Sequence, residues 1–124
     1  MKLLKIPTVT SDALDTGYAV IDVSTLTNIS LTDDDLIIDG NGYTLTFVFD
    51  GTNAAQKLAN VTAMYTYLIS KLKDYFGDLH LLDRRERFIV KELFVGMTIA
   101  EIHTEVGLAR EGAANTAIIS VTLS

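Results

Sequence analysis

Cysteine is absent from this 124-residue chain, and proline occurs only once. Without cysteine the chain cannot hold a disulfide framework, a thiolate nucleophile or a cysteine-ligated zinc or iron–sulfur site. A hydrophobic content of 48% with a single proline is typical of a globular chain and not of a disordered one. A chain of this length can bury a core without disulfides or metals, so we expect one domain over residues 1–124.

Long apolar runs and an excess of positive charge are lacking as well. No run approaches the roughly 18 residues that a membrane-spanning helix needs. Lys5 and Pro7 interrupt the apolar N-terminal stretch before the core of a secretion signal can form. Ten basic against sixteen acidic residues give a net charge of −6, which repels nucleic-acid phosphates and anionic lipids. We therefore expect neither a membrane nor nucleic acid as the default partner.

Residues 1–50 favour β-structure, because threonine, valine, isoleucine, leucine, aspartate and glycine predominate there. Strands are predicted at 18–23 and 26–30. The acidic run 33–35 follows and should form a solvated turn. The N-terminal half is thus expected to be a set of antiparallel strands.

The strongest local pattern is a hairpin. The sequence Asp-Gly-Asn-Gly at 39–42 supplies the positive φ angles of a tight turn between strands at 36–38 and 43–49. Alternate residues of the second strand share one face, which we expect to be buried. This face consists of Tyr43, Leu45, Phe47 and Phe49.

A long amphipathic helix is predicted next, because the period of the apolar residues changes from 2 to 3.6. Asn53 can cap its start, with Gln56 three residues later, and Gly77 can end it. At about 1.5 Å per residue it would span roughly 35 Å. The expected buried stripe is Leu58, Val61, Thr62, Tyr65, Leu68, Ile69, Leu72 and Phe76, and the opposite polar stripe is Gln56, Asn60, Thr66, Ser70 and Lys73.

Two shorter helices are predicted after it, each with a capping-box pattern. The first begins at Asp83 and ends at Gly96, and the second begins at Thr98 and ends at Gly107. Glu86 and Glu101 complete the two boxes. Their inner faces would consist of Phe88, Ile89 and Leu93, and of Ile99, Ile102 and Val106.

The chain ends in a segment of period two, which predicts a strand at 116–124. Its apolar side is Ala117, Ile119, Val121 and Leu123, its polar side is Thr116, Ser120, Thr122 and Ser124, and Ile118 falls on the polar side. These patterns together predict an α+β fold. It consists of antiparallel strands with a hairpin, a long helix, a helical pair and a C-terminal strand that returns to the sheet.

A further pattern lies in 81–118 and is carried by Leu82, Arg84, Glu86, Arg87, Gly96, Met97, Thr98, Glu101, Ile102, Val106 and Gly107. It resembles the helix-turn-helix of bacterial sigma-factor region 4 and of LuxR-type regulators. The resemblance implies a DNA-binding regulator whose DNA contacts would be Arg84, Arg85, Arg110 and Asn115.

The chain departs from that family at two positions. His103 stands where the family has alanine or glycine for close contact between helices, and Ala109 stands where it has a serine or threonine cap. Arg110 is the only basic residue of the expected recognition helix at 110–118, whereas reading bases and holding phosphates usually takes several polar or basic side chains. The other interpretation is a helical pair that packs on the sheet and contacts no DNA.

Oxygen ligands at 33–35, Asp39 and Asn41 raise the alternative of a Ca²⁺ site. On the spacing of an EF-hand loop that starts at Asp39, Asn41 fits. Tyr43 and Thr44, however, fall where an oxygen ligand and a glycine belong. A solvated turn is therefore the favoured interpretation.

Residues that could support catalysis are sparse. His80 and His103 lie on different predicted elements and have no partner at ligand spacing. The chain has neither a nucleophile elbow nor a glycine-rich phosphate loop. We therefore expect no catalytic site, no cofactor, no metal and no small-molecule substrate.

The order of elements over residues 3–70 combines a Lys-Ile-Pro-Thr start, an irregular strand pair, the hairpin and an alanine-rich helix. It resembles small virion-associated proteins of tailed phages. In those proteins a strand follows soon after the helix, whereas here residues 77–115 intervene. The resemblance implies a homo-oligomeric structural protein of the virion, found in the virion or the cytoplasm, whose partners are itself or other virion proteins. The threonine-rich hairpin and the terminal strand would expose edges for a neighbouring subunit.

The terminal strand separates the two hypotheses. If 116–123 pairs in a sheet, little room is left for a recognition helix after Gly107, and the helix-turn-helix pattern serves only the fold. If the segment is helical, the regulator is favoured.

Overall fold

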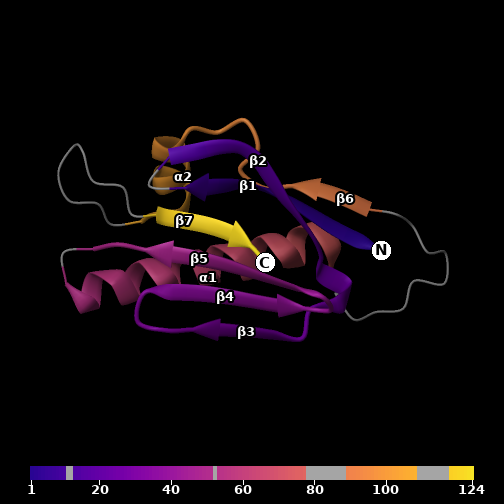
Figure 1. Ribbon diagram of the computed structural model, residues 1–124, viewed down its shortest axis with the longest axis horizontal. Helices are drawn as coiled ribbons and strands as arrows, with labels where there is room; N and C mark the ends of the chain where they lie inside the picture. Colours follow the sequence, from indigo (N-terminus) through magenta and orange to yellow (C-terminus); the bar gives the residue numbers. More distant parts are fainter. Residues whose placement is uncertain (11–12, 52, 78–88, 109–117) are drawn as a thin grey trace.

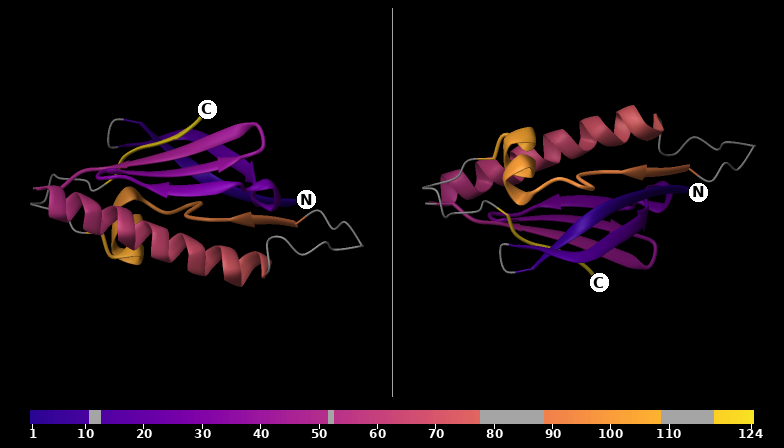
Figure 2. Two further views of the ribbon diagram at one scale, coloured as in Figure 1. Left: turned by 90° about the horizontal axis from the view of Figure 1, so that it is seen from below. Right: turned by 90° about the horizontal axis from the view of Figure 1, so that it is seen from above.

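A twisted sheet covered on one face by a long helix makes up the fold of the computed structural model (Figures 1 and 2). The structure describes residues 1–10, 13–51, 53–77, 89–108 and 118–124. The expected α+β class is confirmed. The elements are β1 (Lys2–Thr10), β2 (Ala13–Asp22), the 3-10 turn Val23–Thr25, β3 (Asn28–Leu31), β4 (Asp35–Gly40), β5 (Tyr43–Phe49), α1 (Ala54–Phe76), β6 (Ile89–Glu92), α2 (Ile99–Val106) and β7 (Ile118–Leu123).

The described strands follow the order β2-β1-β7-β5-β4-β3, and every neighbouring pair on this path is antiparallel. β6 stands off the path and runs parallel to the first half of β1, where Lys2 pairs with Ile89 and Lys5 with Glu92. β7 meets the same edge of β1 further along, at Val9. One edge of β1 is thus shared between β6 and β7.

The predicted hairpin is confirmed. β4 and β5 pair up to Gly40 and Tyr43, and the turn between them contains Gly42 at φ 83°. Leu45, Phe47 and Phe49 are buried and Tyr43 is partly buried, as the alternation of β5 predicts. This face packs toward the helical layer.

β1 is a strand that the sequence pattern did not predict. It contains Pro7, which cannot donate a backbone hydrogen bond, and the register with β2 shifts between Pro7 and Val9. A proline fits a strand at such an irregularity because no ladder bond is lost there. β2 and β3 confirm the strands expected at 18–23 and 26–30, with boundaries displaced by a few residues.

α1 begins and ends where the sequence predicts. Asn53 accepts a hydrogen bond from the Gln56 amide at its start, and Gly77 follows its last turn at φ 66°. The predicted stripe is partly wrong, because Leu58, Thr62 and Ile69 are exposed. The buried residues are Asn60, Val61, Met64, Leu68, Leu72 and Phe76.

Asn60 corrects the expectation that it lies on the polar side. It is 1% exposed, and its Nδ2 donates to the backbone oxygen of Asp50 at 2.9 Å. Residues 58–70 lack charge, so the apolar period alone does not determine which side faces the sheet. Packing on the sheet decided the rotation of the helix.

The first of the two short helices, predicted from Asp83 to Gly96, is absent from the part of that segment that the structure describes. Ile89–Glu92 is a strand, and the amide of Leu93 donates to the oxygen of Lys5 at 2.8 Å. The β-branched pair Ile89 and Val90 suits a strand, and β1 offers an unpaired edge that satisfies its backbone. Residues 93–96 at the end of that predicted helix form a bend and a turn, and 83–88 lie outside the described residues.

The second short helix is confirmed as α2. Thr98 and Glu101 form both bonds of the capping box, and Gly107 ends the helix in the left-handed conformation at φ 81°. Ile102 is buried, whereas Ile99 and Val106 are partly buried against the core.

β7 confirms the C-terminal strand and corrects its detail. Ile118 pairs with Phe49 and Ser120 with Val48, so the chain bulges by one residue between them. The bulge places Ile118 on the same side as Val121, and both are buried. The predicted polar position of Ile118 is wrong for this reason. Leu123 keeps the register of Val121 but is 42% exposed at the end of the strand.

The exposed edges are not those that the sequence suggested. The hairpin is flanked by β3 and β7, and β7 is flanked by β1 and β5, so these strands lie inside the sheet. Among the described strands, β2 and β3 end the path instead. β3 is only four residues long, and β2 is interrupted by its shift in register, features that disfavour pairing at an edge.

Candidate assembly surface

One side of α1 points away from the sheet (Figure 2) and has an unusual composition for a helix surface. No charged residue occurs in the helix between Lys57 and Lys71. Leu58 is 48% exposed and Ile69 is 37% exposed. A surface helix ordinarily presents charged side chains to water, so this side lacks the composition of a solvated face.

Small side chains form a shallow groove along the same side. Its volume is about 860 Å³. We call this surface the α1 face; it is lined by Ala55, Leu58, Ala59, Thr62, Ala63, Thr66, Tyr67 and Ser70, with Val106 of α2 at its margin. Short side chains allow the backbone of another helix to approach closely.

α2 borders one flank of the α1 face. The Tyr67 hydroxyl donates to Oε1 of Glu105 at 3.2 Å, and the Tyr67 ring stacks on Phe94 with ring centroids 5.5 Å apart. Burial, together with the charge and hydrogen bond of Glu105, raises the pKa of Tyr67 to about 12. Lys71 Nζ lies 5.5 Å from the centroid of the same ring. This flank is therefore held in place by specific contacts.

An acidic turn lies at the N-terminal end of α1. Asp33 and Asp34 line a small hollow together with Asn53, Ala54 and Lys57. Burial and the neighbouring Asp34 raise the pKa of Asp35. The turn is therefore a concentration of negative charge beside the start of the helix.

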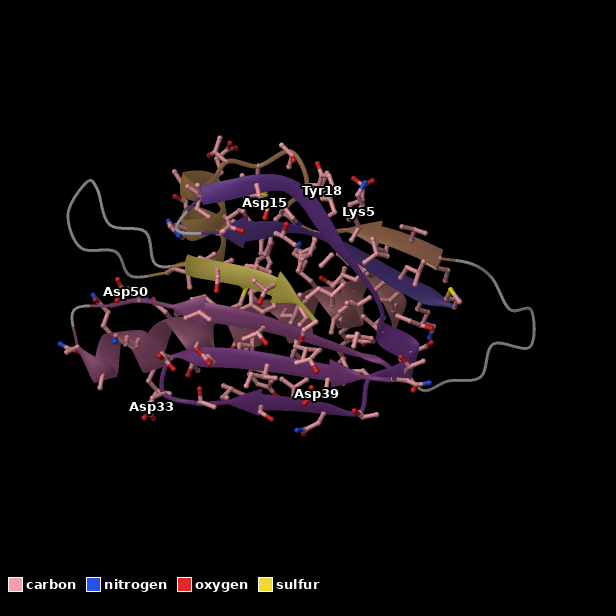
Figure 3. All side chains as sticks on the ribbon, viewed as in Figure 1. Lys5, Asp15, Tyr18, Asp33, Asp39 and Asp50 are labelled. Atoms are coloured by element: carbon pink, nitrogen blue, oxygen red, sulfur yellow. The ribbon has the colours of Figure 1, made fainter. Side chains whose placement is uncertain are left out.

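This arrangement does not form the calcium site that the sequence raised as an alternative. Asp33 and Asp39 lie at opposite ends of β4, so their carboxylates cannot share one ion (Figure 3). Asp39 Oδ1 accepts instead from the Thr44 hydroxyl at 2.8 Å. Within the described parts of the chain, no three histidine, cysteine, aspartate or glutamate side chains gather as metal ligands.

On the side of the sheet opposite α1, polar side chains interact with neighbours on the same pair of strands. Asp15 accepts from the hydroxyls of Thr8 and Thr10 and from the Gly17 amide at 2.7 Å. These bonds, that of Thr8 first, lower the pKa of Asp15. Lys5 Nζ lies 4.4 Å from the ring centroid of Tyr18 (Figure 3). This side carries charge, unlike the α1 face.

The residues that the helix-turn-helix resemblance implies as DNA contacts cannot be placed. Arg84, Arg85, Arg110 and Asn115 all lie outside the described residues, as does His80. His103 is buried, and its Nε2 accepts from the Ile118 amide at 3.3 Å. The histidine that departs from the family pattern thus joins α2 to β7.

The α1 face was missed by the sequence pattern, which assigned Leu58 and Ile69 to the core. One signal could have located it: the uncharged stretch 58–70 is too uniform for a helix with a single buried side.

No helix among the described residues has the length and apolar character needed to span a bilayer. Comparisons with protein-family models, with curated proteins and with solved structures each returned no match.

Proposed function

We propose that this chain is a non-enzymatic structural protein that assembles through the α1 face into a homo-oligomer. The observation that carries the proposal is the absence of charge over residues 58–70. Leu58 is exposed at the groove of small side chains, and Ile69 is exposed on the same helix outside the groove lining. Exposed apolar patches of this kind on small proteins are typical of protein–protein contact.

The strength of the contact can be bounded. Full burial of a leucine or isoleucine contributes roughly 1.5–3 kcal/mol relative to full exposure. Leu58 and Ile69 are already about half covered, so each adds only about 1 kcal/mol on association. Association itself costs about 4–15 kcal/mol. Leu58 and Ile69 of two subunits together offset only the lower end of this cost. We therefore expect a weak contact, at the millimolar end of the range between micromolar and millimolar dissociation constants.

Sedimentation velocity and light scattering over that range of concentration test the oligomer. The wild-type mass should rise with concentration, and Leu58→Lys should hold the chain at the monomer mass. Leu31→Lys is the matched control, because Leu31 is also exposed but lies on β3. A wild-type chain that stays monomeric at millimolar concentration would overturn the proposal.

The biological setting of the oligomer is proposed from the resemblance of residues 3–70 to virion-associated proteins of tailed phages. Mass spectrometry of purified phage particles tests it. Peptides of this chain should be found in particles at a constant ratio to the major structural proteins. Their absence from particles, with the chain present in the infected-cell lysate, would exclude a virion role while leaving self-assembly intact.

The DNA-binding regulator is the second candidate, and the capped helix α2 is the observation that favours it. Two observations weigh against it. Ile89–Glu92 is a strand where the motif needs its first helix. β7 begins at Ile118, the last residue of the segment expected for the recognition helix. A gel shift at low salt distinguishes the two. Binding that is lost on substitution of Arg84, Arg85 and Arg110 would favour the regulator.

A further inference from the structure

We propose that His103 is an acid-sensitive switch within the fold: the neutral imidazole holds the start of β7 to α2, and protonation releases that strand. His103 lies in α2 and is 1% exposed, and its Nε2 accepts from the amide of Ile118 at 3.3 Å. α2 and the start of β7 lie at the same end of the molecule (Figure 1). This inference goes beyond the proposed function and does not depend on it.

The bond between His103 and Ile118 fixes the charge of the ring. A ring nitrogen accepts a hydrogen bond only when it carries no proton, so the neutral ring has its proton on Nδ1. A second proton can bind only at Nε2. The imidazolium would then direct an N–H at the N–H of Ile118, and the amide would lose its acceptor. Protonation of His103 and its bond to β7 therefore exclude each other.

Ile118 is the residue at which β7 enters the sheet. It is buried and pairs with Phe49 of β5, and the register between the two strands shifts directly after this pair. At this irregularity the amide of Ile118 has its acceptor in the His103 side chain. Further along the strand, Val121 pairs with both β1 and β5. Loss of the His103 bond should therefore loosen the start of β7 before the rest of the strand.

Charged groups on the elements around His103 have contacts of their own. On α2, Glu101 accepts from the backbone at the start of the helix and Glu105 accepts from a tyrosine hydroxyl of α1. Asp50, which follows β5, accepts from the next amide, and Lys71 of α1 lies over two tyrosine rings. β7 has no ionisable side chain, and the two lysines of β1 lie in the half that pairs with β6. Each of these charged groups thus has a contact that does not involve the imidazole.

Acid should weaken the contact between α2 and β7. In the unfolded chain an ordinary imidazole takes up a proton at about pH 6.5, whereas the folded contact excludes that proton. The stability that the contact contributes is therefore fully present above about pH 6.5 and is lost as the pH falls below this value. Since one proton is taken up on release, the equilibrium constant for release should rise by up to about tenfold per pH unit.

Hydrogen exchange of the Ile118 amide tests the switch, with the amides of α1 as the internal reference. Between pH 7 and pH 5 the protection factor of Ile118 should fall about tenfold or more. His103→Gln should remove this dependence, because the glutamine oxygen can accept the same bond and does not titrate. His80→Gln is the matched control, since it removes the other histidine and should leave the dependence in place. Asp35, whose pKa is also raised, is common to all three chains and cancels in the comparison.

The imidazole itself gives a second measurement that needs no variant at position 103. In the His80→Gln chain one histidine remains, and its ring resonances should stay those of the neutral form at pH 6.5 and change only together with the Ile118 amide. A ring that titrates near pH 6.5 while Ile118 stays protected would overturn the proposal. So would a His103→Gln chain whose Ile118 amide keeps the wild-type dependence on pH. If His103→Gln does not fold at pH 7, the titration of the His80→Gln chain decides alone.

Discussion

Gly40 and Tyr43 face each other at the end of the hairpin, and the ring occupies the space above the glycine. A Cβ added at Gly40 would lie 2.1 Å from Cζ of Tyr43. The Tyr43 hydroxyl donates to the Asp22 oxygen at 2.9 Å, which fixes the ring in this position. The hairpin is thereby tied to the end of β2.

Gly40→Ala should lower the free energy of unfolding by about 1–3 kcal/mol, because the ring must move and its hydrogen bond is strained. Urea denaturation measures the change. In a Tyr43→Ala background the same substitution should cost much less, since no ring remains to clash. An equal cost in both backgrounds would contradict the explanation.

The phenol of Tyr67 should titrate at high pH, because its surroundings raise its pKa. Its folded pKa of about 12 lies above the ordinary value of 10, so folding favours the protonated phenol. The corresponding stability is present below about pH 10 and is lost as the pH rises toward 12. Titration of tyrosinate absorbance should contain a component near pH 12 that Tyr67→Phe removes. Glu105→Gln should move this component toward lower pH, because the carboxylate contributes to the shift.

At the scale of elements, α2 depends on its cap more than α1 does. It has only eight residues, and isolated helices of that length do not persist in water. Its capping box and its contact with Tyr67 therefore contribute part of the stability that so short a helix lacks.

Thr98→Ala should lower the free energy of unfolding by about 0.5–2 kcal/mol, because the Glu101 amide loses its acceptor. Thr104→Ala is the control on the same helix, since the Thr104 hydroxyl only returns a bond to the Ala100 oxygen. Hydrogen exchange of the α2 amides, measured beside urea denaturation, locates the effect. Loss of protection spread evenly over the sheet would contradict a local role for the cap.

Elements whose ends are marked by a turn or a capping residue were predictable from the sequence. The Asp-Gly-Asn-Gly turn, the Asn53 cap of α1 and the Thr98 box of α2 each satisfy backbone groups within a few residues, so their signal is local. β6 has no such signal. Its backbone is satisfied by β1, which lies more than eighty residues away in sequence, so the helical pattern there was misleading.

For the whole molecule, β7 is the strand that joins the two parts of the sheet. Val121 pairs with Val9 of β1 on one side and with Phe47 of β5 on the other. The amide of Ile118, at the start of β7, donates to the buried His103, which connects the same strand to α2. The C-terminal segment thus holds together elements from the beginning, middle and end of the chain.

Val121→Asp should abolish cooperative unfolding or lower its midpoint severely, because it buries an unpaired carboxylate between β1 and β5. Leu123→Asp is the matched control, since Leu123 lies on the same strand and is 42% exposed. Thermal and urea denaturation by circular dichroism compare the two. A Val121→Asp variant as stable as Leu123→Asp would show that β7 does not carry this role.

By itself the sequence determined the α+β class, the hairpin, both ends of α1, the capped helix α2 and the existence of a C-terminal strand. These follow from short-range hydrogen bonding and from the period of apolar residues, which a chain carries wherever it folds. The tertiary structure decided the rest: the strand at β6, the rotation of α1 that exposes Leu58 and Ile69, and the bulge that buries Ile118. Each of these depends on which strand edge or sheet face is available to pack against, and that is fixed only when distant segments meet.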